Sequence, residues 1–258
     1  MTAAKESEVT TLATVQDDAQ SIIIPPCDLE SDEPELESDL HRDQIELLLA
    51  CLKWYWRSRD DFYATGNLTI YYSQERITTR EFRGPDFFVV LGCKNHPRSS
   101  WMLWVEDGKY PNIIVELLSN STARVDRTTK KELYQNTFRT PEYFWFHPVT
   151  LEFQGFRLMA GKYEAIVANE SGWLWSQQLE LFLGVYQSKL RYFSLEGELV
   201  PTPLERAEAA QQEVQVAQQQ VEAAQQQAEV ERQQKELAQQ QVEELLARLK
   251  DLGVDPEI

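Results

Sequence analysis

Five blocks between residues 84 and 147 decide the fold: GPDFFVVLG (84–92), SWMLWVE (100–106), IIVELLSNST (113–122), RVDRTTKKELYQ (124–135) and PEYFWFH (141–147). Two of these blocks contain long apolar runs, at residues 87–91 and 113–118. Such runs are typical of strands that are buried on both faces of a sheet. Two acids, Asp86 and Glu116, stand at or within such runs. A carboxylate near a sheet core has to be paired, hydrogen-bonded, protonated or metal-bound, because an unpaired buried charge is costly.

Two interpretations of these acids are open. Carboxylates brought together from neighbouring strands, with a lysine close by, can hold a divalent cation such as Mg²⁺ and a water that attacks phosphate. Alternatively, they are acids at strand ends that pair with nearby arginines. The next predicted helix, residues 122 to about 138, carries Lys130 and Lys131, which must point in different directions because they are adjacent on a helix.

The flanking segments alternate between helical and strand-like patterns. Apolar residues from Leu40 to Trp56 recur at helical spacing, and Ser38 or Asp39 can cap this helix. Further strands are expected at residues 67–72, 87–91, 101–105, 113–118, 142–146, 151–158, 163–167, 173–175, 181–185 and 190–193. The pattern predicts an α/β or α+β domain over residues 35–200, with a mixed sheet flanked by helices.

The two ends of the chain differ in composition from this centre. Residues 1–34 are rich in Ser, Thr, Asp, Glu and Pro, and we expect them to form a disordered acidic arm. Residues 204–252 repeat every seven residues, which predicts a long coiled-coil helix, followed by a short tail at residues 253–258.

One a/d register collects the apolar residues of this repeat: Ala207, Ala210, Val214, Ala217, Val221, Ala224, Ala228, Ala238, Val242, Leu245, Leu249 and Leu252. Glu231 and Lys235 occupy the same register and interrupt it. Because an alanine-rich seam is shallow, a lone or partly frayed helix is the alternative, and the leucine end is where association should be firmest.

The charge of the chain is concentrated at its ends. The formal net charge is −17, but residues 1–40 carry −10, residues 201–258 carry −7, and the middle is neutral. The acidity therefore does not exclude a basic cleft in the body, or DNA as a partner.

The cysteines and histidines show no metal-ligand spacing: Cys27, Cys51, Cys93, His41, His96 and His147. A disulfide framework or structural zinc is therefore not expected. The longest apolar run near the N-terminus, residues 22–24, stops at two prolines, and acids stand where a signal peptide has bases. We expect no membrane-crossing segment and a reducing, cytoplasmic location.

The ordered blocks GPDFFVV, IIVELLS, STARVDRTTKKELY and PEYFWF resemble the Uma-type family of restriction endonucleases, within the wider PD-(D/E)xK nuclease superfamily. The resemblance covers roughly residues 35–193 and leaves the heptad tail outside. It implies a restriction-endonuclease-like core with a metal site on two central strands. It also implies Mg²⁺ or Mn²⁺ as cofactor and DNA as substrate.

The resemblance assigns roles to individual residues. Asp86, from the PD block, would be the first metal ligand and Glu116 the second, and the main-chain carbonyl of Leu117 could complete the coordination. The ExK pattern would place a lysine at residue 118, where this chain has Leu118. Similar sequences have a lysine on the next helix in its place, and in this chain Lys130 stands at that position. It would position or activate the attacking water and shield the charge on the phosphate.

Three further residues are candidates for the site. Glu37 precedes the first helix, where some family members contribute an acid, although it also suits the helix dipole there. Asp126 shares a helix face with Lys130 and Tyr134, and the alternative is an ordinary surface pair of Asp126 with Lys130. Ser119 could bind a phosphate or a metal-bound water, or simply cap the following turn.

Three hypotheses follow for the function. The first is a magnesium-dependent endonuclease that cleaves phosphodiester bonds of DNA. The second is a non-catalytic, nuclease-like interaction protein, held in a homo-oligomer, such as a dimer, by its coiled coil. The third is a nuclease for RNA or structured substrates, which nothing in the chain separates from the first. The first two are compatible in part, because many nucleases cut both strands as dimers.

Overall fold

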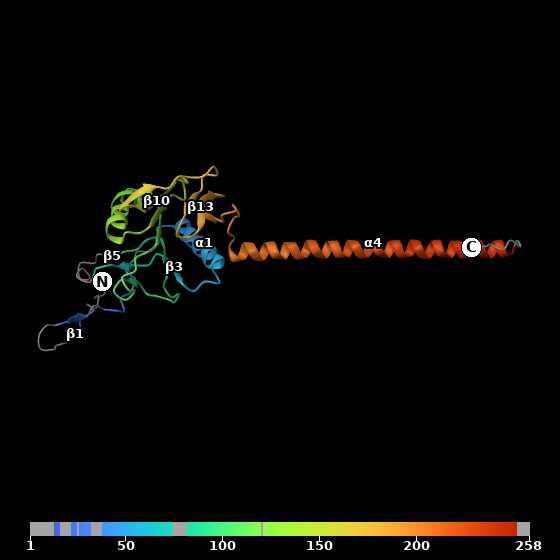
Figure 1. Ribbon diagram of the computed structural model, residues 1–258, viewed down its shortest axis with the longest axis horizontal. Coiled ribbons are helices and arrows are strands. Elements are labelled where there is room, and N and C mark those ends of the chain that lie inside the picture. Colours follow the sequence, from blue (N-terminus) through green and yellow to red (C-terminus); the bar gives the residue numbers. More distant parts are fainter. Residues whose placement is uncertain are drawn as a thin grey trace, which may run out of the picture. The chain divides into compact units, whose positions relative to one another are not determined.

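The computed structural model describes residues 13–15, 22–24, 26–31, 38–73, 82–119 and 121–251, with side chains described from residue 26 onward. The chain divides into two compact units, Met1–Thr202 and Pro203–Ile258. The first contains the predicted sheet and its helices, and the second contains the heptad repeat (Figure 1).

A six-stranded mixed sheet forms the centre of the first unit (Figure 1). Its strands are, in spatial order, β11 (Lys162–Ala165), β10 (Phe153–Met159), β9 (Glu142–Phe146), β8 (Ile113–Leu117), β6 (Phe87–Leu91) and β3 (Phe62–Gly66). Strands β8 and β9 run parallel, whereas the other neighbouring pairs are antiparallel. All residues of β8 and β9 are buried, as their largely apolar sequences predict, and these include Glu116 and Glu142. The predicted mixed sheet is confirmed.

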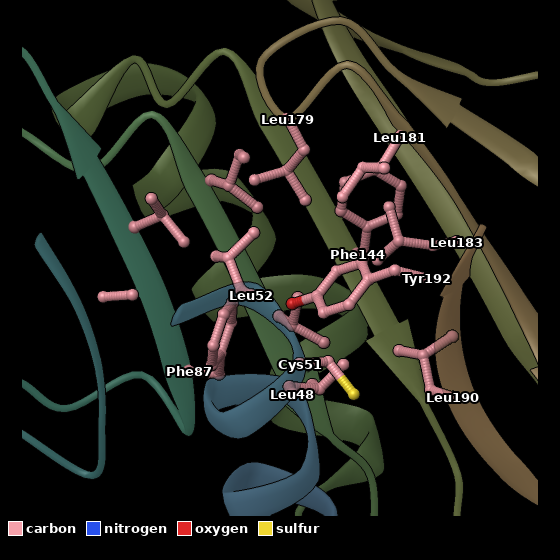
Figure 2. Close-up of a cluster of buried hydrophobic side chains, with 14 of the residues drawn as sticks. Leu48, Cys51, Leu52, Phe87, Phe144, Leu179, Leu181, Leu183, Leu190 and Tyr192 are labelled. Carbon is pink, nitrogen blue, oxygen red and sulfur yellow. The ribbon is translucent and has the colours of Figure 1, made fainter. Parts of the chain in front are cut away.

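Helix α1, Asp39–Tyr55, packs with one face of this sheet. The side chain of Ser38 caps it by accepting a hydrogen bond from the main-chain N–H of His41. Leu48 and Leu52 of α1 lie in one buried cluster with Phe144 of β9 (Figure 2). Of the two predicted caps, Ser38 is the one used, and the predicted apolar stripe is confirmed from Ile45 to Trp56, whereas Leu40 is 54% exposed.

A three-stranded antiparallel sheet completes this apolar cluster. It consists of β12 (Leu174–Ser176), β13 (Leu181–Tyr186) and β14 (Lys189–Phe193). Leu181, Leu183 and Leu190 contribute to the cluster (Figure 2). The side chain of Gln44 on α1 both donates to the carbonyl and accepts from the amide of Leu190, at 2.9 and 3.0 Å. This pair of bonds fixes α1 against β14.

A second helix packs with the alternate residues of the same central strands. It comprises α2 (Ala123–Val125), the π-helical turn η1 (Asp126–Lys130), α3 (Lys131–Leu133) and the π-helical turn η2 (Tyr134–Phe138), and is called the 123–138 helix below. Tyr134 and Phe138 lie in a buried cluster with Phe88, Ile114 and Tyr143. Since successive strand residues point to opposite faces, the sheet is covered by different helices on its two sides.

The strand predicted at residues 67–72 is wrong in its bounds. The structure has β3 before it, a turn at Asn67 with φ of 48°, and then the two-residue strand β4, Ile70–Tyr71. The sequence of β3 includes Ala and Gly, which are poor strand formers and hide the pattern. Gly66 is required by packing, because a Cβ there would lie 2.3 Å from Ile45 Cγ2 and 2.7 Å from the carbonyl oxygen of Asp86.

Strand β4 belongs to a small sheet with β5 (Phe82–Arg83) and β7 (Trp101–Met102). The predicted strand at residues 101–105 is therefore shorter than expected. Residues 26–31, which the sequence places in the acidic arm, are hydrogen-bonded to this region. Ser100 Oγ donates to the carbonyl of Leu29 at 2.6 Å, and Trp104 Nε1 donates to that of Pro26 at 2.8 Å. Two short strands, β1 (Ala13–Val15) and β2 (Ile22–Ile24), pair antiparallel earlier in the chain.

The second unit contains one helix, α4, Pro203–Asp251, of 49 residues. None of its described residues is buried, and apolar a/d residues such as Val221 and Leu245 are 56% and 59% exposed. The long C-terminal helix is thus as predicted, and Leu252 of the register lies outside the described residues. None of the described helices is long and apolar enough to cross a membrane.

Candidate metal-dependent nuclease site

Asp86 and Glu116 are brought together by the register of β6 and β8. Phe87 pairs with Val115 in this antiparallel ladder, so the residue before β6 lies opposite Glu116. Asp86 Oδ2 accepts a hydrogen bond of 2.6 Å from the main-chain N–H of Leu117. The first acid therefore bonds to the backbone of the strand that carries the second.

Glu116 is fully buried and has two partners on the 123–138 helix. Tyr134 donates its hydroxyl hydrogen to Glu116 Oε1 at 2.6 Å, and Lys130 Nζ lies 2.9 Å from Oε2. The helix face predicted from the spacing of Asp126, Lys130 and Tyr134 is the face that meets this carboxylate. No arginine is paired with either strand acid among the described ion pairs, in contrast to the alternative interpretation of these acids.

Lys130 also contacts a second acid of its own helix. Its Nζ lies 2.8 Å from Asp126 Oδ1, and the Asp126 side chain is only 1% exposed. The pair is therefore buried. The alternative interpretation of this spacing, an ordinary surface pair, is wrong. Within the described part of the chain, neither carboxylate oxygen of Asp126 accepts a hydrogen bond of good geometry. Asp126 Oδ1 is thus engaged in the ion pair with Lys130, and Oδ2 is the oxygen that lies outside that pair.

Burial dominates the electrostatics of the cluster. Desolvation, reinforced by repulsion from Asp86, raises the pKa of Glu116 to about 7, although Lys130 acts in the opposite direction. Desolvation likewise raises the pKa values of Asp86 and Asp126. Burial alone would lower the pKa of Lys130, but Glu116, Asp126 and Asp86 together raise it above its ordinary value. Lys130 is therefore a permanent cation among three acids with weakened ionisation.

His41 is a residue of this site that sequence reasoning missed. Its Nε2 lies 3.0 Å from the carbonyl oxygen of Leu117, and its Nδ1 lies 2.8 Å from Ser38 Oγ. Since a carbonyl only accepts, Nε2 carries the proton and Ser38 donates to Nδ1. The contact joins residues 76 positions apart, and no local pattern in the sequence could have indicated it.

The remaining candidates are placed as follows. Ser119 Oγ accepts hydrogen bonds from the main-chain N–H groups of Ser121 and Thr122 at 3.2 and 3.1 Å, which is the geometry of a turn cap. Lys131 points away from the acids, with its Nζ 3.3 Å from the ring centroid of Phe156. Glu37 lies outside the described residues.

The donor atoms suit a hard divalent cation. Mg²⁺ prefers oxygen ligands, retains several waters and is commonly held by one or two carboxylates. Asp86, Glu116 and the Leu117 carbonyl offer such oxygens close to one another, and the carboxylate of Asp126 lies in the same cluster through its ion pair with Lys130. Among the described residues, no group of three or more His, Cys, Asp or Glu side chains could hold a metal by itself. A cation there would accordingly need the main-chain carbonyl and water as further ligands.

An α/β domain with a mixed central sheet between helices has the architecture of the restriction-endonuclease-like class. The family described as "Uma2: Putative restriction endonuclease" matches residues 33–191, and the chain belongs to that family.

Solved structures that are similar to this chain include that of "a putative nuclease belonging to DUF820" from Anabaena variabilis. The two are 12% identical, with a TM-score of 0.42, over 65% of this chain and 83% of that chain. Among curated proteins, none matches the sequence.

Proposed function

We propose that the protein is a metal-dependent endonuclease that hydrolyses phosphodiester bonds of DNA. The observation that carries this proposal is the cluster of Asp86, Glu116 and Lys130, in which Asp86 lies opposite Glu116 across two central strands and Lys130 of the following helix pairs with Glu116. Membership of a restriction-endonuclease family supports the same chemistry.

The proposed roles follow from the contacts. Asp86, Glu116 and the carbonyl of Leu117 would hold Mg²⁺ or Mn²⁺, and His41 would keep that carbonyl in place through its hydrogen bond. The cation, when bound, would supply Lewis acidity and a more acidic water. Lys130 would stabilise negative charge on the phosphate rather than act as a base, because its raised pKa keeps it protonated.

The test is nicking of supercoiled plasmid by the full chain in Mg²⁺, Mn²⁺ or EDTA, combined with calorimetric titration of each metal. Cleavage is expected with either metal and not with EDTA. We expect heat of binding for the wild type and none for Asp86→Ala, because the variant lacks a ligand. Equal metal binding by the two proteins, or nicking that persists in EDTA, would contradict the assignment.

The second candidate function, an interaction protein assembled by α4, is favoured by one observation. The helix exposes its apolar a/d residues along its whole described length and has none of them buried. A seam of this kind is stable when it is covered by a second helix, and this helix is roughly 70 Å long at 1.5 Å per residue. We propose a homodimer through α4, which is compatible with nuclease activity.

Light scattering measures the molar mass in solution. Removal of residues 203–258 is expected to convert the dimer into a monomer, so the measured molar mass should be that of one truncated chain. Leu245→Gln combined with Leu249→Gln should have the same effect, because both lie on the a/d register. The matched control is Val230→Gln with Leu237→Gln, since these apolar residues of the same helix are also exposed, at 51% and 56%, but lie off the register. Unchanged stoichiometry in the truncated chain would show that α4 is not an assembly device.

A further inference from the structure

A cavity of about 410 Å³ is lined by residues at the ends of β8 and β9. Its polar lining comes from three places: the start of α1 with Ser38 and His41, the segment after β8 with Ser119 and Ser121, and the loop after β9 with His147. No carboxylate is among its described lining residues, although the acid cluster is close by in the sequence. The cavity is therefore suited to a different ligand from the cation proposed for the acids.

His147 supplies a buried donor to this cavity. The residue is 7% exposed, and its Nδ1 accepts hydrogen bonds from the main-chain N–H groups of Val149 and Thr150 at 3.2 and 3.4 Å. A neutral imidazole that accepts at Nδ1 carries its proton on Nε2. Within the part of the chain that the structure describes, Nε2 has no hydrogen-bond partner. The His147 side chain is thus more than nine-tenths buried and lines the cavity, and its Nε2–H group has no acceptor among the described residues.

The start of α1 makes the same cavity favourable for an anion. Helix α1 has 17 residues, and its first turn, with Ser38 as cap, contributes to the lining. The N-terminus of a helix carries partial positive charge and unpaired N–H groups. The Ser119 hydroxyl accepts from two main-chain amides and lies 2.8 Å from Ser121 Oγ and 3.0 Å from Thr122 Oγ1, so it belongs to a group of hydroxyls beside the cavity.

The cavity adjoins the proposed cleavage site through shared residues. His41 lines the cavity and also lies 3.0 Å from the carbonyl oxygen of Leu117, the proposed metal ligand. Ser119 follows Leu117 by two positions and lines the cavity as well. A DNA strand carries a phosphate at every nucleotide, spaced by about 3.4 Å along the helix axis, and the shared residues His41 and Ser119 connect the cavity to the place where one of these phosphates would be cleaved.

We propose that this cavity binds the phosphodiester group next to the scissile one, with His147 Nε2–H donating to a phosphate oxygen. The inference rests on the proposed nuclease function and adds to it the residue that holds the strand in register. Contacts to phosphate position a protein on nucleic acid without reading sequence, and Ser side chains and helix N-termini commonly make them.

Two substitutions at one position test the proposal. His147→Asn keeps an acceptor near the place of Nδ1, so the turn at Val149 and Thr150 is retained, but the deep donor is lost. His147→Gln instead carries an amide donor near the place of Nε2. The measurement is fluorescence anisotropy of a labelled DNA duplex of about 20 base pairs, a length of roughly two helical turns, with the full chain and with Ca²⁺ in place of Mg²⁺.

His147→Asn is expected to bind the duplex about three- to tenfold more weakly, as for the loss of one hydrogen bond, and His147→Gln is expected to recover most of the affinity. Duplexes that carry a single uncharged methylphosphonate identify the partner group. A methylphosphonate at one linkage should weaken binding to the wild type and have no effect on binding to His147→Asn. The reason is that the methylphosphonate and the substitution remove the same interaction.

The outcomes separate this inference from the proposed function. Equal affinity of the wild type and His147→Asn would overturn the cavity assignment and leave metal-dependent cleavage untouched. Loss of affinity in His147→Asn without the methylphosphonate effect would also overturn it, since the donor would then act on a group other than phosphate. A wild type that neither binds nor cuts DNA would overturn both proposals.

Discussion

Glu116→Gln is expected to reduce metal-dependent plasmid cleavage by at least about 100-fold, more than the loss typical of residues that only support a metal ligand. Glutamine has the same shape as glutamate and can still accept the hydrogen bond from Tyr134, but it carries no charge for a cation. Asp86→Asn should reduce cleavage similarly, because it also removes a carboxylate charge. The remaining oxygen of the asparagine can still accept from the Leu117 amide, so the local structure is retained. Both variants are therefore expected to fold and to fail in catalysis.

The matched control for these variants is Glu132→Gln. Glu132 is an exposed acid on the 123–138 helix, so the same chemical change is made outside the cluster. Its cleavage rate should equal that of the wild type. Near wild-type cleavage by Glu116→Gln or Asp86→Asn, with folding verified by circular dichroism, would remove these acids from the proposed site.

In metal-free buffer, the free energy of unfolding is expected to fall as the pH rises from about 4.5 to about 7. The folded-state pKa of Glu116 is about 7, above its ordinary value of 4.5, so the folded protein binds more protons than the unfolded chain in this window. Each unit of pKa difference corresponds to about 1.4 kcal/mol, which gives a total of about 3 kcal/mol. Asp86 and Asp126 act in the same direction, since their pKa values are also raised.

Chemical denaturation followed by tryptophan fluorescence measures this effect in the first unit, because all seven tryptophans precede residue 203. Glu116→Gln should flatten the dependence, since it removes the titrating group and its repulsion of Asp86. Added Mg²⁺ should restore stability above pH 7, where the acids are ionised and can bind it. The proposed role of burial would be contradicted if the free energy of unfolding of the wild type rose between pH 4.5 and 7 by the same amount as that of the variant.

Much of the fold was predictable because the signals are local. The buried strand β6 is an unbroken apolar run, β8 and β9 are apolar apart from Glu116 and Glu142, and the stripe of α1 recurs at helical spacing. The strand β3 was not predictable, because Ala and Gly weaken its pattern. Gly66 is needed there only because Ile45 of α1 and the Asp86 carbonyl approach it closely. The packing of residues 26–31 was missed because Leu29 and Pro26 are held through their main-chain carbonyl groups, which any residue possesses.

The candidate site was predictable in part. The spacing of Asp126, Lys130 and Tyr134 indicates a common helix face, and that face meets Glu116. The burial of Asp126 was not foreseen, because an acid and a lysine four residues apart usually lie on a surface. His41 was outside the reach of any motif, since its contact with Leu117 depends on how α1 packs with the sheet.

The sequence by itself determined the apolar runs, the acids placed within them, the heptad repeat and the family resemblance, because each is a property of residue order. Only the tertiary structure decided that Asp86 lies opposite Glu116, that Lys130 lies within 3 Å of two acids, and that His147 lines a cavity at the ends of β8 and β9. The physical reason is that ionisation and hydrogen bonding depend on distance and burial, which arise when segments far apart in the chain pack together.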